Sequence, residues 1–101
     1  MTNQNVQSIQ KNPLFNLGRT VATPGAIEAL QQAGVSAASL LGRHHCGDWG
    51  DLEDEDIARN NSALRLGSRL VSSYQITETI KIWVITEADR SATTLLLPQD
   101  Y

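Results

Sequence analysis

Residues 80–87 read IKIWVITE and are the most strand-like stretch of the chain. β-Branched and aromatic side chains favour extended backbone, and near the middle of this segment apolar side chains fall on both faces. A strand that is apolar on both faces belongs in the interior of a sheet. The segment therefore predicts a central strand, around which the rest of the fold can be assembled.

Two further strand-like segments flank this central one. Residues 69–76 alternate between two faces, and residues 92–97 read ATTLLL and are closed by a proline. The connections between the three segments, residues 77–79 and 88–91, are short enough for hairpin loops. The C-terminal part of the chain thus predicts a three-stranded antiparallel meander, to which the extended residues 19–22 could add a fourth strand.

Helices are expected before the meander. Thr23 and Pro24 are typical of a helix start, and Gly34 is typical of a helix end, so we expect a helix of about ten residues between them. A short helical turn over residues 36–41 should follow and end at Gly42.

A third and longer helix is expected over residues 52–66. Asp51 is the expected N-cap and Gly67 the expected end. Four acidic residues in its first turn lie where the helix dipole favours negative charge. The predicted fold class is therefore α+β, with two to three helices packed on one face of a three- to four-stranded antiparallel sheet.

Length and composition are consistent with one compact domain. The chain has 101 residues, of which 41% are hydrophobic and 19% charged. Residues 1–13 are rich in Gln and Asn and predict a flexible N-terminal tail, which leaves residues 14–101 as a single α+β domain.

The charge and the single cysteine narrow the functional class. A net charge of −3 does not favour nucleic acid as the partner, although Arg59, Arg65, Arg69 and Lys81 could form a local basic patch. One cysteine requires no oxidising compartment, and no apolar stretch predicts a signal peptide or a membrane span. We therefore expect a cytoplasmic protein without membrane contact and without a cofactor.

The segment HHCGDWGD, residues 44–51, concentrates the reactive side chains of the chain. Its residue types suit zinc, but they come from one segment and adjacent histidines tend to point apart, so we expect no metal site. A structural interpretation explains most of it. Gly47 and Gly50 would bracket a turn that Asp48 closes, and Trp49 would enter the core under the third helix.

A catalytic interpretation rests on general acid–base chemistry. A histidine with an arginine and an acid is sufficient for RNA cleavage through the 2′-hydroxyl. The order of elements resembles the small barnase-like bacterial ribonucleases, in which helices precede an antiparallel sheet. The candidates would be His44 or His45 with Glu87, Arg69 and Arg90, but the last two strands carry no counterpart of the family's late catalytic histidine.

Two other segments are further candidates for a functional role. Asn60 and Asn61 stand in the middle of the third helix, where asparagine is a weak helix former. They predict either a solvent-facing pair, a bond to the preceding loop, or recognition of a partner. In the turn over residues 86–91, either Glu87 or Asp89 is expected to form an ion pair with Arg90, close to residues 44–51.

The motif Arg-His, two free positions, then Gly-Asp-Trp-Gly resembles a family of small bacterial proteins carried on plasmids and other mobile elements. The resemblance covers residues 14–101 and rests on LGRTVATPGAIEAL, LLGRHHCGDWGDL, ARNNSALRLGSRLVSSY and IWVITEADRSATTLLLPQDY. In this chain the motif corresponds to Arg43, His44, Gly47, Asp48, Trp49 and Gly50. The resemblance implies no particular activity. It implies that a binding partner would belong to host defence or plasmid maintenance.

These observations predict a small, non-enzymatic accessory protein that binds a macromolecular partner, which is expected to be a protein. The candidate binding residues are Arg43, His44, Asp48, Trp49, Asn60, Asn61, Asp89 and Arg90. The metal-independent ribonuclease is the alternative. The exposed edge of a small sheet would also allow a homodimer.

Overall fold

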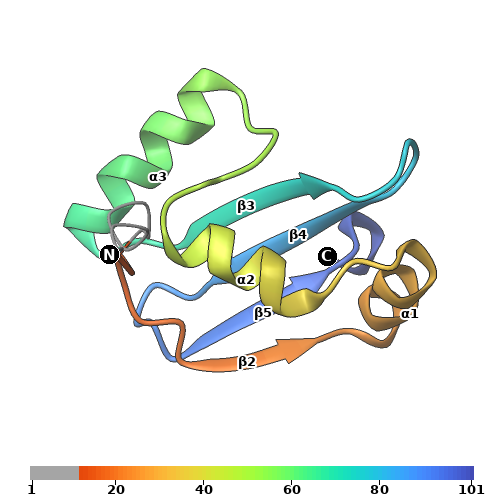
Figure 1. The fold of residues 1–101 in the computed structure, drawn as a ribbon. Helices are drawn as coiled ribbons and strands as arrows, with labels where there is room; N and C mark the ends of the chain where they lie inside the picture. Colours follow the sequence, from red (N-terminus) through yellow and green to blue (C-terminus); the bar gives the residue numbers. More distant parts are fainter. Residues whose placement is uncertain (1–11) are drawn as a thin grey trace, which may run out of the picture.

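The fold is a four-stranded sheet with three α-helices, and it confirms the predicted α+β class (Figure 1). The computed structural model describes residues 12–101, so the predicted tail over residues 1–13 lies almost wholly outside the described residues. The elements in chain order are β2 (Arg19–Ala22), α1 (Pro24–Ala33), α2 (Ala37–His45), α3 (Asp54–Leu66), β3 (Leu70–Gln75), β4 (Lys81–Thr86), β5 (Ala92–Leu96) and the 3-10 helix η2 (Pro98–Asp100).

The strand order in the sheet is β2-β5-β4-β3. The segment IKIWVITE supplies β4, which lies between two antiparallel neighbours as predicted: Val84 pairs with Ser72 on one side and with Leu95 on the other. The three C-terminal strands therefore form the expected meander, and β2 adds the fourth strand.

The expectation of a purely antiparallel sheet is wrong in one pair. β2 runs parallel to β5, with Val21 opposite Thr94. Hairpins impose antiparallel pairing only on strands that follow each other directly, whereas α1, α2 and α3 separate β2 from the meander. The direction of β2 thus depends on where the chain returns to the sheet, and no local sequence signal specifies that.

Helix α1 begins and ends where its capping residues predict. Thr23 Oγ1 accepts a hydrogen bond from Ala26 N at 3.1 Å, and Gly34 ends the helix with a φ of 69°. Helix α2 instead continues through Gly42 to His45, so the prediction of a stop at Gly42 is wrong. A helical glycine costs only about 1 kcal/mol, and packing of the apolar face outweighs it.

Helix α3 starts at Asp54, two residues later than predicted. Glu53 is the N-cap residue and makes no side-chain cap. The expected cap, Asp51, instead accepts a hydrogen bond from Gln75 N on β3 at 3.1 Å. The expectation that Asp51 caps this helix is therefore wrong, because the edge of the sheet takes its carboxylate.

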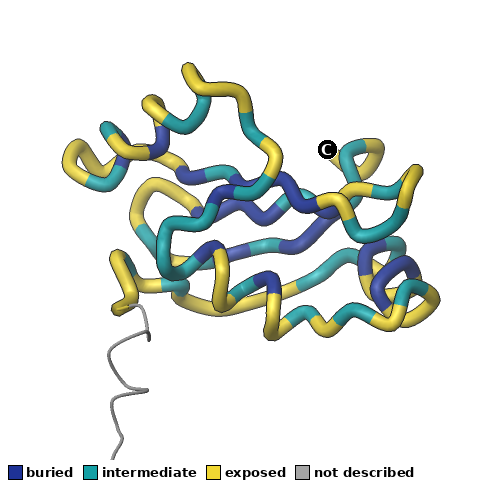
Figure 2. The backbone as a smooth tube through the Cα atoms, turned by 45° about the horizontal axis from the view of Figure 1, so that its top comes forward, coloured by how far each residue is buried: buried dark blue, intermediate teal, exposed yellow. Residues whose placement is uncertain are grey.

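The core has two parts. Helices α1 and α2 cover one face of the sheet, while α3 lies at the β3 end (Figure 1). The first cluster fills the covered face and comprises Ala26, Ala29, Leu30, Leu40, Tyr74, Ile82, Val84 and Leu95. The second cluster packs Trp49 with Ala63 and Leu70 at α3, as predicted for the indole. Figure 2 shows the buried positions concentrated along β3, β4 and β5, whereas β2 and much of α3 are exposed.

Over residues 12–101, the helices lack the combination of length and apolar character that crossing a bilayer requires.

Candidate functional site

The segment HHCGDWGD divides at the end of α2. Its two histidines complete the helix, and the chain then turns through two glycines with positive φ, 87° at Gly47 and 78° at Gly50. Gly50 N donates to Asp48 Oδ1 at 3.2 Å, which is the predicted Asx turn. These turns bring the chain alongside the edge strand β3.

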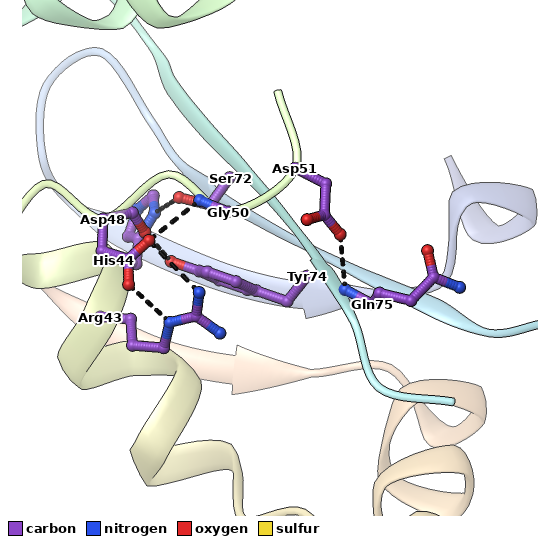
Figure 3. A network of polar contacts seen from close by, with 8 residues as sticks. All are labelled: Arg43, His44, Asp48, Gly50, Asp51, Ser72, Tyr74 and Gln75. Carbon is purple, nitrogen blue, oxygen red and sulfur yellow. Dashed lines mark hydrogen bonds and ion pairs between the residues drawn. The ribbon is translucent and has the colours of Figure 1, made fainter. Parts of the chain in front are cut away.

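Arg43 and Asp48 form an ion pair at the start of this turn (Figure 3). Arg43 Nε donates to Asp48 Oδ2 at 2.7 Å, and Nη2 donates to Oδ1 at 3.3 Å. The guanidinium also lies 4.5 Å from the centre of the Tyr74 ring. Burial raises the pKa of Tyr74 to about 12, so its hydroxyl stays protonated and donates to the Asp48 carbonyl at 2.5 Å. The two predicted binding residues thus fix the turn.

Residues 49–51 cover the outer edge of β3. Ser73 N donates to Trp49 O at 3.1 Å, and Asp51 N donates to Ser73 O at 2.7 Å. Asp51 Oδ2 accepts from Gln75 N one step farther along the strand (Figure 3). A Cβ at Gly50 would lie 2.0 Å from the Ser73 carbonyl oxygen, so this close approach requires glycine.

Asn60 and Asn61, predicted as recognition residues, both make contacts inside the fold. Asn60 is buried; its Nδ2 donates to Val71 O at 2.7 Å and its Oδ1 accepts from Val71 N at 3.1 Å. Asn61 Oδ1 accepts from Trp49 Nε1 at 3.3 Å. Every N–H of β3 that faces away from β4 therefore has a partner, at Val71, Ser73 and Gln75.

His44 is fully buried and belongs to a chain of side-chain hydrogen bonds. Its Nδ1 lies 2.6 Å from Ser72 Oγ, and its Nε2 lies 2.8 Å from Thr86 Oγ1. Thr86 Oγ1 lies 2.7 Å from Thr93 Oγ1, which donates to the carbonyl of Leu17 at 2.7 Å.

The Leu17 carbonyl, at the end of this series of hydrogen bonds, determines which atom donates in each bond. Because Thr93 gives its one hydroxyl hydrogen to Leu17, Thr86 must donate to Thr93. Nε2 of His44 therefore carries the hydrogen that Thr86 accepts, and Nδ1 accepts from Ser72. The arrangement satisfies a neutral imidazole, and burial accordingly lowers the pKa of His44 to about 4, with the adjacent His45 adding to the effect.

The residues proposed for ribonuclease chemistry do not share an open cleft. His44 has no exposed surface, while Glu87 is exposed in the turn between β4 and β5. Phe15 packs edge-on against His44, with ring centres 5.2 Å apart, and the Arg90 guanidinium lies 5.8 Å from the same Phe15 ring. His45 also packs edge-on against Phe15.

Arg90 bonds to main-chain carbonyls rather than taking part in the expected ion pair. Its guanidinium donates to Ser68 O at 2.6 Å and to Ala63 O at 3.1 Å, which joins the β4–β5 turn to the C-terminal end of α3. Asp89 Oδ1 accepts from Ser91 N at 3.0 Å, and the hydrogen bonds from Ser91 lower the pKa of this carboxyl. Arg90 holds a positive φ of 61° within these contacts.

Nowhere in residues 12–101 do three or more His, Cys, Asp or Glu side chains gather in a way that could hold a metal ion. Both ring nitrogens of His44 are already hydrogen-bonded to hydroxyls.

A surface groove of about 680 Å³ lies between α3 and the sheet face that α1 and α2 leave uncovered. We call it the α3–sheet groove. Its lining carries three acidic side chains, Asp51, Glu53 and Asp56, and three basic ones, Arg59, Arg69 and Lys81. Val71, Trp83 and Leu52 add apolar surface to the same groove.

Several contacts orient the basic side chains that line this groove. Arg69 donates to the hydroxyl of Tyr101 at 2.7 Å, and Tyr101 packs edge-on against Trp83 with ring centres 5.9 Å apart. Arg59 pairs with Asp56 at 2.5 Å, whereas Lys81 is exposed. Arg69 is thus held in position, and the apolar and charged groups of the groove are adjacent.

Sequence reasoning missed Trp83 as a candidate site residue and named Lys81 only as part of a possible basic patch. Both alternate with the buried Ile82 and Val84 in β4, which places them on the opposite face of the sheet. The signal was present, since a lysine and a tryptophan two positions apart in a central strand mark a face that a helix does not fully cover.

Comparison with known proteins gives no further guide to the site. No protein-family model, no curated protein and no solved structure matches the chain.

Proposed function

We propose that this protein is a small, non-enzymatic binding protein that holds an extended segment of a partner protein in the α3–sheet groove. The observation that carries the proposal is the make-up of the groove: about 680 Å³, lined by the apolar Trp83 together with acidic Asp51 and Glu53 and basic Arg69 and Lys81. Binding sites for peptides combine apolar anchors with a few charged groups that fix orientation.

The charges indicate what the partner segment must carry. Three carboxylates and three cations line the same groove, so a uniformly anionic strand such as nucleic acid would meet repulsion along part of it. A peptide with an apolar or aromatic residue between one basic and one acidic residue would match both sides.

The reactive residues support a binding role over catalysis. His44 is enclosed and neutral, Arg90 is bonded to carbonyls, and Asn60 is bonded to Val71. The cytoplasm, inferred from the single cysteine, is the proposed setting. A partner from host defence or plasmid maintenance follows from the resemblance of the Arg-His-x-x-Gly-Asp-Trp-Gly motif to mobile-element proteins.

A selection from a random peptide display library tests this function. We expect enriched peptides that pair a basic and an acidic residue around an apolar one, and their affinity should fall about tenfold in Lys81→Glu. Arg65→Glu is the matched control, because Arg65 is exposed on α3 and does not line the groove.

A compensating charge exchange sharpens the test. If a peptide acid faces Lys81, replacing it with lysine should restore binding to Lys81→Glu and weaken binding to the original protein. Peptides that bind both variants equally, or a library that yields none, would contradict the proposal.

A further inference from the structure

The two edges of the sheet differ in whether their outward main-chain groups are hydrogen-bonded. Residues 49–51 and Asn60 bind the outward N–H groups of β3, as described above. At the other edge, Arg19 N donates to the carbonyl of Ser91, just before β5, and Thr23 N donates to the carbonyl of Leu95 in β5, so the odd-numbered residues of β2 face β5. The main-chain groups of Thr20 and Ala22 therefore point away from the sheet, where no other strand of residues 12–101 lies.

Apolar surface accompanies this open edge. Val21 is 40% exposed, and Ile27 of α1 is 46% exposed. Ile27 also lines a hollow of about 250 Å³ beside β2, whose other walls include Ala22, Leu30, Val35 and Ala37. An added strand would cover both the free main-chain groups and this apolar surface.

We propose that a second copy of the chain occupies this edge, with β2 pairing antiparallel to β2 of the partner about a two-fold axis. The pairing extends the sheet to eight strands, in the order β3-β4-β5-β2-β2-β5-β4-β3. Because β3 is closed at the far side of each protomer, association stops at two copies and does not continue into a fibre. The inference is independent of the α3–sheet groove.

The main-chain pattern selects one register. In this register Thr20 of each copy lies opposite Ala22 of the other. Each of these two pairs forms two main-chain hydrogen bonds, which gives four bonds across the axis. A register centred on Thr20 would instead set Ala22 opposite Gly18, which lies outside the strand. The chosen register sets Val21 opposite itself, as a close pair that is not hydrogen-bonded.

The charges agree with this register. Arg19 stands opposite Thr23 of the other copy, and the hydroxyl of Thr23 donates to Asp100 Oδ2 at 2.6 Å. An arginine and an aspartate thus approach each other at both ends of the paired strands, and no like charges face each other. A two-fold axis perpendicular to the sheet also keeps both copies of α1 on one side, where the exposed Ile27 side chains lie.

Light scattering after size exclusion, over a concentration series, gives the first test. We expect twice the 11.0 kDa chain mass at high concentration. Val21→Lys sets two lysines opposite each other and should raise the dissociation constant by roughly tenfold or more. Leu66→Lys is the control: Leu66 is 73% exposed on α3, away from β2, and this variant should remain dimeric. A mass of one chain throughout, or a dimer that Val21→Lys leaves unchanged, would overturn the proposal.

A cross-link tests the register itself. In a Cys46→Ser background, Val21→Cys should form an interchain disulfide on mild oxidation, because Cα atoms in such a pair lie about 4.5 Å apart. Thr20→Cys, which faces Ala22 rather than itself, should cross-link far more slowly. Equal rates for the two variants, or no cross-link at Val21→Cys, would exclude this arrangement.

Discussion

Asn60 forms two hydrogen bonds with the backbone of Val71: its Nδ2 donates to the carbonyl at 2.7 Å, and its Oδ1 accepts from the N–H at 3.1 Å. A side-chain amide carries the same donor and acceptor as a peptide group, so the helix residue completes the strand edge in place of a neighbouring strand. This pair attaches α3 to β3 and thereby forms one wall of the α3–sheet groove.

Removing this amide should be costly. Asn60→Ala leaves Val71 N–H and C=O without their partner beside a helix, and we expect a loss of about 1–3 kcal/mol in the free energy of unfolding, measured with urea. Asn61→Ala is the neighbouring control, since Asn61 is exposed and makes one bond of 3.3 Å to Trp49. Equal losses in the two variants would mean that the Asn60–Val71 bonds contribute no special stability.

Two glycines should respond to alanine with opposite signs. Gly50→Ala places a Cβ 2.0 Å from Ser73 O at a φ of 78°, and we expect a loss of at least about 2 kcal/mol. Gly42 lies inside α2, where an added Cβ meets nothing within 4 Å, so Gly42→Ala should gain about 0.5–1 kcal/mol. Thermal and urea unfolding of both variants measure the difference, and a stabilised Gly50→Ala would contradict the edge packing.

The buried imidazole predicts a specific dependence of stability on pH. His44 has a folded pKa of about 4 against 6.5 for the free side chain, so the unfolded chain binds the extra proton between these values. Its contribution is complete above pH 6.5 and is lost as the pH falls from 6.5 toward 4. We expect the free energy of unfolding to fall by about 2 kcal/mol between pH 7.5 and 5, and His44→Gln should remove this part of the slope.

Nuclear magnetic resonance tests the same imidazole without a mutation. The ring nitrogens of His44 should show hydrogen on Nε2 and no titration above pH 5. Titration of His44 near pH 6.5, or a hydrogen on Nδ1, would refute the donor order derived from Thr93 and Leu17.

Local sequence signals predicted the fold well where the chain itself makes the contact. Thr23, Gly34 and the alternation around Trp83 act within a few residues, and α1 and the meander follow from them. The direction of β2 and the start of α3 depend on contacts made across the fold. Asp51 matches a helix cap in sequence, but the Gln75 N–H, 24 positions away, is where its carboxylate binds.

The candidate site was harder to predict for the same reason. Histidine and arginine in a dense motif suggest catalysis. The hydroxyls of the His44 network, however, come from three strands distant in sequence, on Ser72, Thr86 and Thr93. The groove is likewise assembled from two loops, a helix and two strands. Only the folded chain shows that Arg43 and His44 build a scaffold, whereas the alternation in β4 already indicates that Lys81 and Trp83 share the face opposite Ile82 and Val84.

The most direct measurement of the binding function is chemical-shift mapping with a selected peptide. The two tryptophans provide an internal comparison: the Trp83 indole lines the groove, whereas the Trp49 indole is buried against α3 and bonded to Asn61. We expect the signals of Trp83, Lys81 and Arg69 to move on binding while the Trp49 indole signal stays in place. Shifts centred on β2 and α1, with Trp83 unchanged, would contradict the α3–sheet groove as the binding site.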